Sequence, residues 1–401
     1  MTKLESRRQV NSFALLLAAT YMVSYITRIN FGAIISEMQT DTGISKAMLS
    51  MSLTGSFITY GAGQVVSGIL GDNISPKKLV TLGFLATIAM NLLIPLCGSP
   101  WLMLAVWSVN GFAQSFMWPP LVKMMSEKLS EEDYKRVVSK TSWGSSIGTV
   151  LVYLLAPLLI SAFSWRAVFL FSAGAGIVML ILWNRFSFDV QPRPRQQAAA
   201  QTAKGILNPV LLALVIAIVL MGMLRDGVTT WMPTYISDTY KLSNEISILT
   251  GIILPIFSIL CFQAATWLYT KKLTNPVSCA GVFFAAGAVA ALTLRFSAGS
   301  FAAVSILMFA VLTGCMHGVN LMLVCMVPNY FKKTGKVSTA SGILNAFTYI
   351  GSAISTYGIA VLSDAFGWNA TILIWLGIAA VGTVICLLTI RPWNNYQKNL
   401  Q

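Results

Sequence analysis

Long apolar segments recur along the whole chain, and each is about as long as a bilayer is thick. A spanning helix needs roughly 20 mostly apolar residues. Only 10% of the 401 residues are charged and 56% are hydrophobic, which leaves too little polar surface for a soluble globule. The sequence therefore predicts an all-α membrane protein with twelve spans, near residues 11–38, 47–70, 79–97, 101–126, 138–162, 166–184, 208–236, 246–269, 275–295, 301–328, 337–362 and 368–390.

The positive charges lie mainly in the loops between these segments. The formal net charge is +14, but the basic residues form short groups rather than one charged face, which indicates a positive-inside bias and no nucleic-acid partner. An even number of spans puts both termini on one side of the membrane. We therefore expect a multi-pass protein of the cell's inner (plasma) membrane, in contact with the lipid bilayer, with both termini cytoplasmic.

A polar stretch separates the spans into two sets of six. Residues 185–207 have few apolar anchors and several prolines and glutamines, a composition typical of a flexible linker. The expected domains are an N-terminal six-helix bundle at 1–184, this cytoplasmic linker at 185–207, and a C-terminal six-helix bundle at 208–401. Two matched bundles suit alternating access by rocking.

An arginine lies about midway along the first apolar segment of each half. Arg28 and Arg225 each follow the start of their segment by about 17 residues. A charge at this depth costs at least ~2.5 kcal/mol on insertion scales, so each arginine must face the protein interior or a water-filled cavity. A guanidinium presents a planar fork of donors that matches phosphate oxygens. The two arginines predict one shared anion site, to which each half contributes.

Asp226 follows Arg225 directly, yet successive helical side chains point about 100° apart. The sequence therefore predicts that Asp226 is poorly placed to neutralise Arg225 and that the empty site keeps excess positive charge. Closing such a site without an anion would cost several kcal/mol. This reasoning predicts exchange of one anion for another, without a proton carrier.

Aromatic residues accompany Arg28. Tyr21 and Tyr25 lie seven and three positions before it, hence on the same helix face. Trp118 precedes Pro119-Pro120, which should break the backbone ladder and kink the fourth span toward the cavity. We predict substrate contacts from Tyr21, Tyr25 and Trp118.

Polar residues also occur in two later spans. His317, the only histidine, stands among small residues in the tenth span, where it can be a substrate ligand or a proton relay. Asn345 and Tyr349, four residues apart, form a polar stripe on the eleventh. We predict that His317, Asn345 and Tyr349 also line the site.

The loop after the second span reads Gly68-Ile69-Leu70-Gly71-Asp72. Glycines let helix ends approach closely, and Asp72 can sit at a helix terminus or pair with a basic neighbour. Gly68 and Asp72 are therefore predicted as gating or structural residues. The corresponding loop of the second half lacks this Gly-x-x-x-Asp pattern.

Three stretches together resemble the organophosphate:phosphate antiporter family of the major facilitator superfamily. Residues 25–31 are similar to its Tyr-x-x-Arg-x-Asn-Phe motif, residues 224–227 with 231–235 to its Leu-Arg-x-Gly and Trp-x-Pro-Thr-Tyr motifs, and Gln114 with residues 118–120 to its Gln-x-x-x-Trp-Pro-Pro motif. The resemblance implies the major facilitator fold, with twelve transmembrane helices in two pseudo-symmetric six-helix bundles. It also implies that Arg28 and Arg225 are the phosphate ligands.

The sequence departs from the glycerol-phosphate members of that family. Gln64 and Ser145 stand where those members have a lysine and a histidine, Ile29 replaces a frequent lysine, and the eighth span lacks their glutamate. The site is thus less basic than the family's, which keeps a second hypothesis open. In it, the protein carries organic carboxylates by antiport or proton symport, with His317 or Asp226 as the proton site.

Our first hypothesis is a monomeric secondary active transporter that exchanges a small phosphate ester for inorganic phosphate. The chain shows no pairing of nucleophile and base, no metal-ligand constellation and no phosphate-cradling glycine loop, so we expect neither enzyme chemistry nor a cofactor. A third hypothesis is a membrane sensor of phosphate esters that does not transport them.

Overall fold

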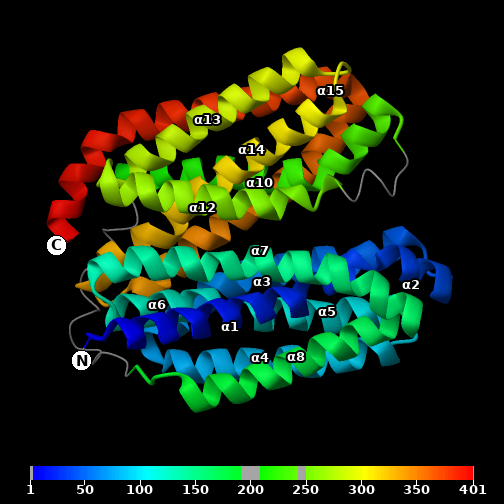
Figure 1. Cartoon of the computed structure of the whole chain (residues 1–401), viewed down its shortest axis with the longest axis horizontal. Coiled ribbons are helices and arrows are strands. Elements are labelled where there is room, and N and C mark those ends of the chain that lie inside the picture. Colours follow the sequence, from blue (N-terminus) through cyan, green and yellow to red (C-terminus); the bar gives the residue numbers. More distant parts are fainter. Residues whose placement is uncertain (1–2, 191–207, 243–249, 401) are drawn as a thin grey trace. The chain divides into compact units, whose positions relative to one another are not determined.

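A computed structural model describes residues 3–190, 208–242 and 250–400 of the chain. Most of the linker expected at 185–207 therefore lies outside the described residues. The described ranges consist of helices and short turns, with no β-strand (Figure 1). Contacts between residues group the chain into two compact units, Met1–Arg195 with Gly335–Ala346, and Gln196–Thr334 with Phe347–Gln401.

In its described residues, the first unit contains eight complete α-helices and the start of α15 (Val337–Leu400). One 3-10 turn, η1 (Ile94–Leu96), follows the fourth helix. The helices are α1 (Arg7–Ala33), α2 (Ile35–Thr42), α3 (Lys46–Asn73), α4 (Pro76–Leu93), α5 (Pro100–Gln114), α6 (Trp118–Lys128), α7 (Glu131–Ala162) and α8 (Trp165–Phe186).

The second unit contains α10 (Pro209–Tyr240), α12 (Ile253–Lys271), α13 (Pro276–Ser297), α14 (Ala302–Asn320) and most of α15 (Val337–Leu400). A π-helix, η3 (Leu321–Met326), and a 3-10 helix, η4 (Val327–Lys332), follow α14. The long α15 is really two helices, because Gly367 between them has φ 75° and ψ 173°. Only glycine adopts such a conformation at low cost.

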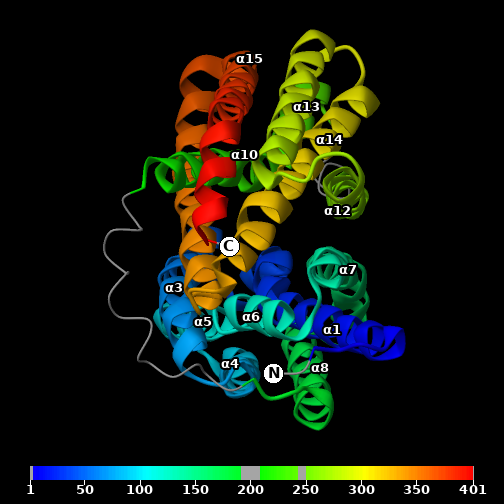
Figure 2. The same cartoon turned by 90° about the vertical axis from the view of Figure 1, so that its left-hand side faces the viewer.

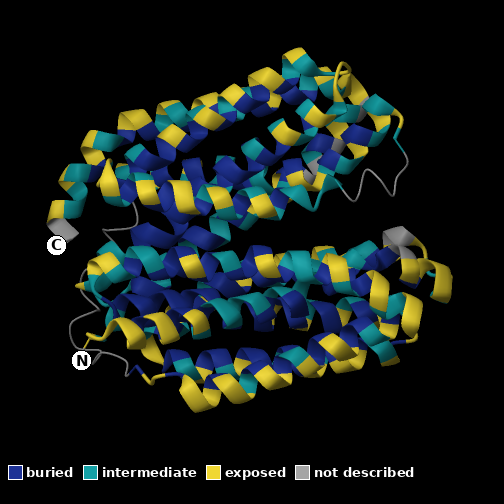
Figure 3. Ribbon diagram, in the orientation of Figure 1, coloured by how far each residue is buried: buried dark blue, intermediate teal, exposed yellow. Residues whose placement is uncertain are grey.

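Within the described residues, the expected spans fall on helices over most or all of their length, and the start of the eighth, 246–249, lies outside those residues. In the described ranges, nine helices are long and apolar enough to cross a membrane. The other three expected spans fall on α3, on the pair α5 and α6, and on the first part of α15. In α3, serines, threonines and glycines interrupt the apolar run. Large apolar side chains such as Leu85, Leu154, Val289 and Leu388 are exposed, and exposed positions recur along the long helices (Figure 3), as expected of helices that face lipid.

The predicted break before Pro119-Pro120 is present. The chain leaves α5 after Gln114, turns through residues 115–117, and begins α6 at Trp118 with prolines in its first turn. Proline has no N–H to donate and clashes with the preceding turn, but it fits the first turn of a new helix. The fourth span is therefore two short helices.

The arginine-bearing helix of the first unit packs against α7 and α8 (Figures 1 and 2). A Cβ atom on Gly144 would lie 2.4 Å from the carbonyl oxygen of Ala18, and one on Gly148 would lie 2.5 Å from that of Met22. Real Cβ atoms do not come this close, so α1 and α7 touch backbone to backbone only because both residues are glycine.

The second unit repeats this contact between α10 and α15. A Cβ atom on Gly222 would lie 2.2 Å from the Thr348 carbonyl oxygen, and one on Gly351 would lie 2.1 Å from that of Val219. In both units, therefore, the helix that carries the arginine packs against one neighbour so closely that a side chain larger than that of glycine would clash at the contact.

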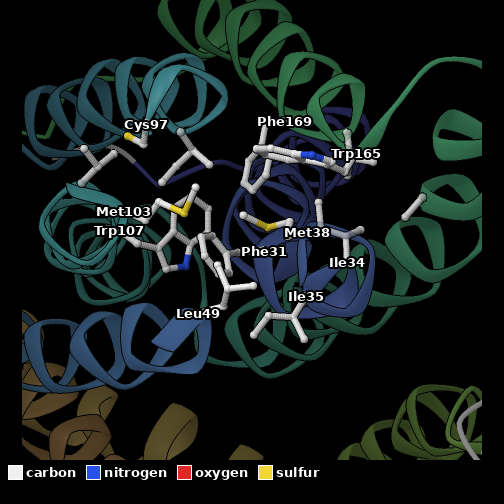
Figure 4. Close-up of a cluster of buried hydrophobic side chains, with 14 residues drawn as sticks. Phe31, Ile34, Ile35, Met38, Leu49, Cys97, Met103, Trp107, Trp165 and Phe169 are labelled. Atoms are coloured by element: carbon white, nitrogen blue, oxygen red, sulfur yellow. The ribbon is translucent and has the colours of Figure 1, made fainter. Parts of the chain in front are cut away.

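A cluster of buried aromatic and aliphatic side chains lies beyond Arg28 in the first unit (Figure 4). The rings of Phe31, Trp107 and Phe169 are mutual neighbours, with centroids 5.2 to 5.9 Å apart. They come from α1, α5 and α8 and are completely buried. The cluster fixes this end of α1 to two other helices.

Candidate functional site

Arg28 lies on α1 against two tyrosine rings. The centre of its guanidinium is 4.1 Å from the centroid of the Tyr25 ring and 4.6 Å from that of Tyr60. Tyr60 comes from α3 and is only 2% exposed. Both distances are within the range in which the negative face of a ring attracts a cation. Two neutral side chains thus stabilise the charge of Arg28.

Tyr21 and Trp118 continue this aromatic group. The Tyr21 ring meets the edge of Tyr25 at 5.1 Å between centroids, and it lies 4.7 Å from the Trp118 ring. Trp118 is the first residue of α6, directly after the break in the fourth span. The first unit therefore brings together four of the residues that the sequence singles out, Arg28, Tyr25, Tyr21 and Trp118.

Buried amides hold the main chain next to Arg28. The carbonyl oxygen of Thr27 accepts hydrogen bonds from the side-chain nitrogens of Asn91 (3.1 Å) and Asn110 (3.2 Å). The Thr27 hydroxyl accepts one from Gln114 Nε2 at 2.8 Å, and Asn30 Nδ2 donates to Asn91 Oδ1 at 2.8 Å. All five residues are at most 1% exposed. Such networks make a packed interior rigid, so they fix the position of α1 at Arg28.

Asn345 packs with the first unit, since residues 335–346 belong to it by their contacts. Its Nδ2 donates to Gln64 Oε1 at 3.0 Å, and both side chains are buried. Tyr349 belongs to the second unit and is half-buried.

Asp72 and Gly68 meet the first turn of α15. The Asp72 carboxylate accepts hydrogen bonds from the backbone N–H groups of Ser338 (3.0 Å) and Thr339 (2.8 Å). A negative charge is favourable at a helix N-terminus. A Cβ atom on Gly68 would lie 2.8 Å from the Ser338 carbonyl oxygen, so the glycine permits the approach.

Lys123 supports the same contact from α6. Its Nζ donates to the carbonyl oxygens of Gly71 (2.8 Å) and Asp72 (3.1 Å) and lies 3.9 Å from Asp72 Oδ1. The lysine is 3% exposed. A buried ammonium needs such partners, and here it ties α6 to the end of α3.

Arg225 forms a bidentate ion pair with Asp226. Its Nε donates to Oδ1 at 2.7 Å and one terminal nitrogen to Oδ2 at 2.8 Å. The expectation that Asp226 is poorly placed to neutralise Arg225 is therefore wrong. The 100° argument concerns the direction of the Cβ atoms, whereas the long, flexible arginine side chain folds back to its neighbour.

Residues of α14 and α15 complete the surroundings of this pair. The other terminal nitrogen of Arg225 donates to Asn320 Oδ1 at 3.3 Å, and the Ser352 hydroxyl donates to the Asp226 carboxylate. His317 is close enough to interact electrostatically with both charged residues, and its ring meets that of Phe262 at 5.5 Å. Of the predicted residues, the second unit thus places His317 on α14 about one turn before Asn320, the hydrogen-bond partner of Arg225.

Asn320 ends α14, immediately before the π-helix Leu321–Met326. Its Nδ2 also donates to the Cys325 sulfur at 3.8 Å. π-helical turns are rare and occur frequently at functional sites. Here the π-helix begins directly after Asn320, a hydrogen-bond partner of Arg225.

Sequence reasoning missed Tyr60, Asn320 and Ser352. Asn320 was detectable, because it is an amide three residues after His317 in an apolar run. Tyr60 and Ser352 give no such signal, since tyrosine and serine are common in spanning helices. Among the described residues, no group of three or more His, Cys, Asp and Glu side chains could hold a metal ion.

These features define a class of protein. Each unit has a partly buried arginine on its first long helix, with dedicated partners, in an α-helical protein whose outer faces are apolar. Such a protein is a multi-pass membrane protein.

Comparison with known proteins gives the family. The sequence profile of the Major Facilitator Superfamily matches residues 17–327, and the chain belongs to this superfamily of membrane transporters. A solved structure of the proton:xylose symporter XylE of the same superfamily matches with a TM-score of 0.79, over 96% of this chain and 97% of that one, at 12% identity. The predicted fold class is confirmed, as is the prediction that the protein is not an enzyme.

Several characterised relatives extend over nearly the whole chain. The probable hexose phosphate transport protein of Chlamydia trachomatis is 22% identical over 95% of this chain and 90% of its own length. The membrane sensor protein UhpC of Escherichia coli is 21% identical (94% and 90%). The glycerol-3-phosphate transporter of Bacillus subtilis is 25% identical (94% and 91%). The predicted resemblance is therefore confirmed.

Proposed function

We propose that this protein exchanges a small phosphate ester for inorganic phosphate across the inner (plasma) membrane. The observation that carries the proposal is the repeated arginine, Arg28 on α1 and Arg225 on α10, each with its own set of side-chain partners. In this proposal both guanidinium groups bind the phosphate group. The two six-helix bundles, residues 1–184 and 208–401, rock about it, and both termini are cytoplasmic.

Phosphate is the best match for two arginines. Each planar fork can donate two parallel hydrogen bonds to a pair of phosphate oxygens, and both forks remain charged at physiological pH. The relatives named for hexose phosphate and glycerol-3-phosphate support the same substrate class. Tyr21, Tyr25, Trp118, His317, Asn345 and Tyr349 are proposed to contact the rest of the substrate.

Exchange follows from what the site recognises. A carrier that holds a phosphate ester mainly by its phosphate group must also bind inorganic phosphate. The bound anion then offsets the cost of enclosing Arg28, whose own helix carries no acidic residue, during reorientation. Asp72 and Gly68 act in this proposal as a gate, because their contact with the first turn of α15 has to be made or broken as the bundles rock.

The test is counterflow in proteoliposomes. Vesicles loaded with inorganic phosphate should take up labelled hexose phosphate, and external phosphate should compete whereas dicarboxylates should not. Uptake that is insensitive to phosphate would reject the exchange. Binding of hexose phosphate without any counterflow would instead indicate a membrane sensor, as UhpC is named.

A second candidate is proton-coupled transport of an organic carboxylate. The observation that favours it is the Asp226 carboxylate on Arg225, since a proton on Asp226 would release the guanidinium. An imposed proton gradient should then drive uptake of a labelled carboxylate into vesicles that contain no phosphate. Phosphate-dependent counterflow without a response to the gradient would exclude this candidate.

A further inference from the structure

Asp226 occupies Arg225 in the way that a substrate anion would. Its two oxygens face Nε and one terminal nitrogen of the guanidinium at 2.7 and 2.8 Å. This is the parallel, two-bond geometry by which arginine binds a carboxylate or phosphate ligand. The remaining terminal nitrogen donates to Asn320. A phosphate group that approaches the edge formed by Nε and the terminal nitrogen bonded to Asp226 must therefore displace this carboxylate.

We propose that Asp226 is an internal anion that the substrate displaces from Arg225 during each transport cycle, and that it thereby sets the affinity of the site. The proposal rests on the proposed function, in which Arg225 binds phosphate. It assigns a role to Asp226, the x residue of the Leu-Arg-x-Gly motif.

The position of the pair allows such displacement. Arg225 and Asp226 are neighbours on α10, so their bonds link no two helices and opening them need not separate any. The side chains are also 12% and 32% exposed, respectively, so neither is sealed in the interior. An ion pair between two helices, fully buried, would be far harder to open.

The carboxylate keeps a partner after displacement. The Ser352 hydroxyl on α15 donates to Asp226 independently of the arginine. The released anion is therefore not left without stabilisation. The hydroxyl of Ser352 holds the carboxylate ready to return when the substrate leaves.

An internal competitor lowers apparent affinity in a simple way. If the guanidinium is available for only about one-tenth of the time, the apparent dissociation constant is about tenfold larger than that of the available state. Weak binding is useful to a carrier, because the substrate must leave on the far side. Removal of the competitor should tighten binding and slow release.

The decisive experiment uses the purified full-length protein and inorganic phosphate as the probe. We expect Asp226→Asn to bind phosphate about tenfold more tightly than the wild type in calorimetry. In phosphate exchange by proteoliposomes, both KM and the maximal rate should fall. The matched control is Asp238→Asn, which removes the same charge from the same helix. Asp238 accepts a hydrogen bond from Trp368, and its variant should bind as the wild type does.

A second variant separates competition from simple charge repulsion. Asp226→Glu keeps the negative charge but moves it by one methylene group, which disrupts the two-bond geometry. Competition predicts a smaller gain in affinity for this variant, whereas repulsion alone predicts none. If Asp226→Asn cannot be recovered folded, Asp226→Glu decides.

The possible failures can be told apart. If the wild type does not bind phosphate, the proposed function is wrong. If the wild type binds phosphate but Asp226→Asn binds it equally or more weakly, Asp226 supports Arg225 structurally and the inference is overturned. Equal gains in Asp226→Asn and Asp238→Asn would also overturn it, since any acid on α10 would then serve.

Discussion

The two arginines occupy corresponding helices, yet their surroundings differ in charge. Arg28 lies over the rings of Tyr25 and Tyr60, on a helix that contains no Asp or Glu. Arg225 is bonded to the carboxylate that follows it in the chain. The faces of two neutral rings attract the first guanidinium, whereas a carboxylate accepts two hydrogen bonds from the second. Arg28 is thus positioned by two rings, whereas Arg225 is positioned by a carboxylate that, in our proposal, also competes with the substrate for it.

The hydrogen bonds around the two arginines also differ. Next to Arg28, three amide side chains from α4 and α5 donate to the carbonyl and hydroxyl oxygens of Thr27. Arg225 itself donates to the Asn320 side chain over a longer distance, 3.3 Å. We infer that the first unit holds its arginine in a fixed position for an anion, whereas in the second unit an anion must first displace Asp226. The following variants can break or sharpen this comparison.

The largest effect is expected for Arg28→Lys. Lysine keeps the positive charge but loses the planar fork, so phosphate binding should weaken by about 1–3 kcal/mol. Calorimetry with inorganic phosphate measures this. The control is Arg166→Lys, which alters an exposed arginine of the same unit and should bind as the wild type does. Unchanged binding and transport in Arg28→Lys would refute a role of Arg28 in anion binding.

Asn91→Ala should lower stability by about 1–2 kcal/mol, because it removes two donors and one acceptor from a buried network. The loss stays moderate, since Thr27 keeps Asn110 and Asn30 keeps Ser172 as partners. Thermal unfolding in detergent measures the change. Asn184→Ala, at an exposed asparagine of α8, is the control. If Asn91→Ala left both stability and phosphate binding intact, the amide network would not fix Arg28.

Tyr60→Leu tests the ring under Arg28. We expect phosphate binding to weaken by about 1 kcal/mol, because the guanidinium loses one of the two faces that position it. Tyr60→Phe keeps the ring and removes only the hydroxyl, so it should remain close to the wild type. Titration of both variants with inorganic phosphate distinguishes the ring from the hydroxyl. Equal losses would assign the effect to the hydroxyl.

The smallest effect is expected for Asp41→Asn. Asp41, beyond the end of the first span, binds the indole N–H of Trp165 and the guanidinium of Arg166. These donors lower the pKa of the Asp41 carboxyl below its usual value. Because this pKa is depressed on folding, the pair stabilises the protein at neutral pH, and that contribution is lost only as the pH falls through the lowered pKa.

An exposed pair of this kind contributes little. Thermal unfolding at pH 7 should therefore hardly distinguish Asp41→Asn from the wild type, and phosphate binding should be unchanged. A loss of binding like that expected for Arg28→Lys would mean that long-range charge, and not local contact, governs the site.

The sequence predicts most of the fold because the membrane imposes simple rules. Apolar segments of the required length identify the spans, and Pro119-Pro120 identifies the break in the fourth. The partners of each arginine follow no such rule. The amides Asn30, Asn91 and Gln114 are conspicuous in apolar segments, but which of them meet depends on how helices far apart in sequence pack. Asp226 was misjudged because the angle between neighbouring Cβ atoms does not limit the reach of a side chain with several rotatable bonds.

The glycines that bring α1 against α7 and α10 against α15 have a consequence for how such carriers diversify. At these four positions a single methyl group would act as a wedge between two backbones. It would tilt the helix and shift its guanidinium without touching the chemistry of the anion site. One alanine at such a position would therefore alter the room available to a bound molecule, while the charges of the carrier stayed the same.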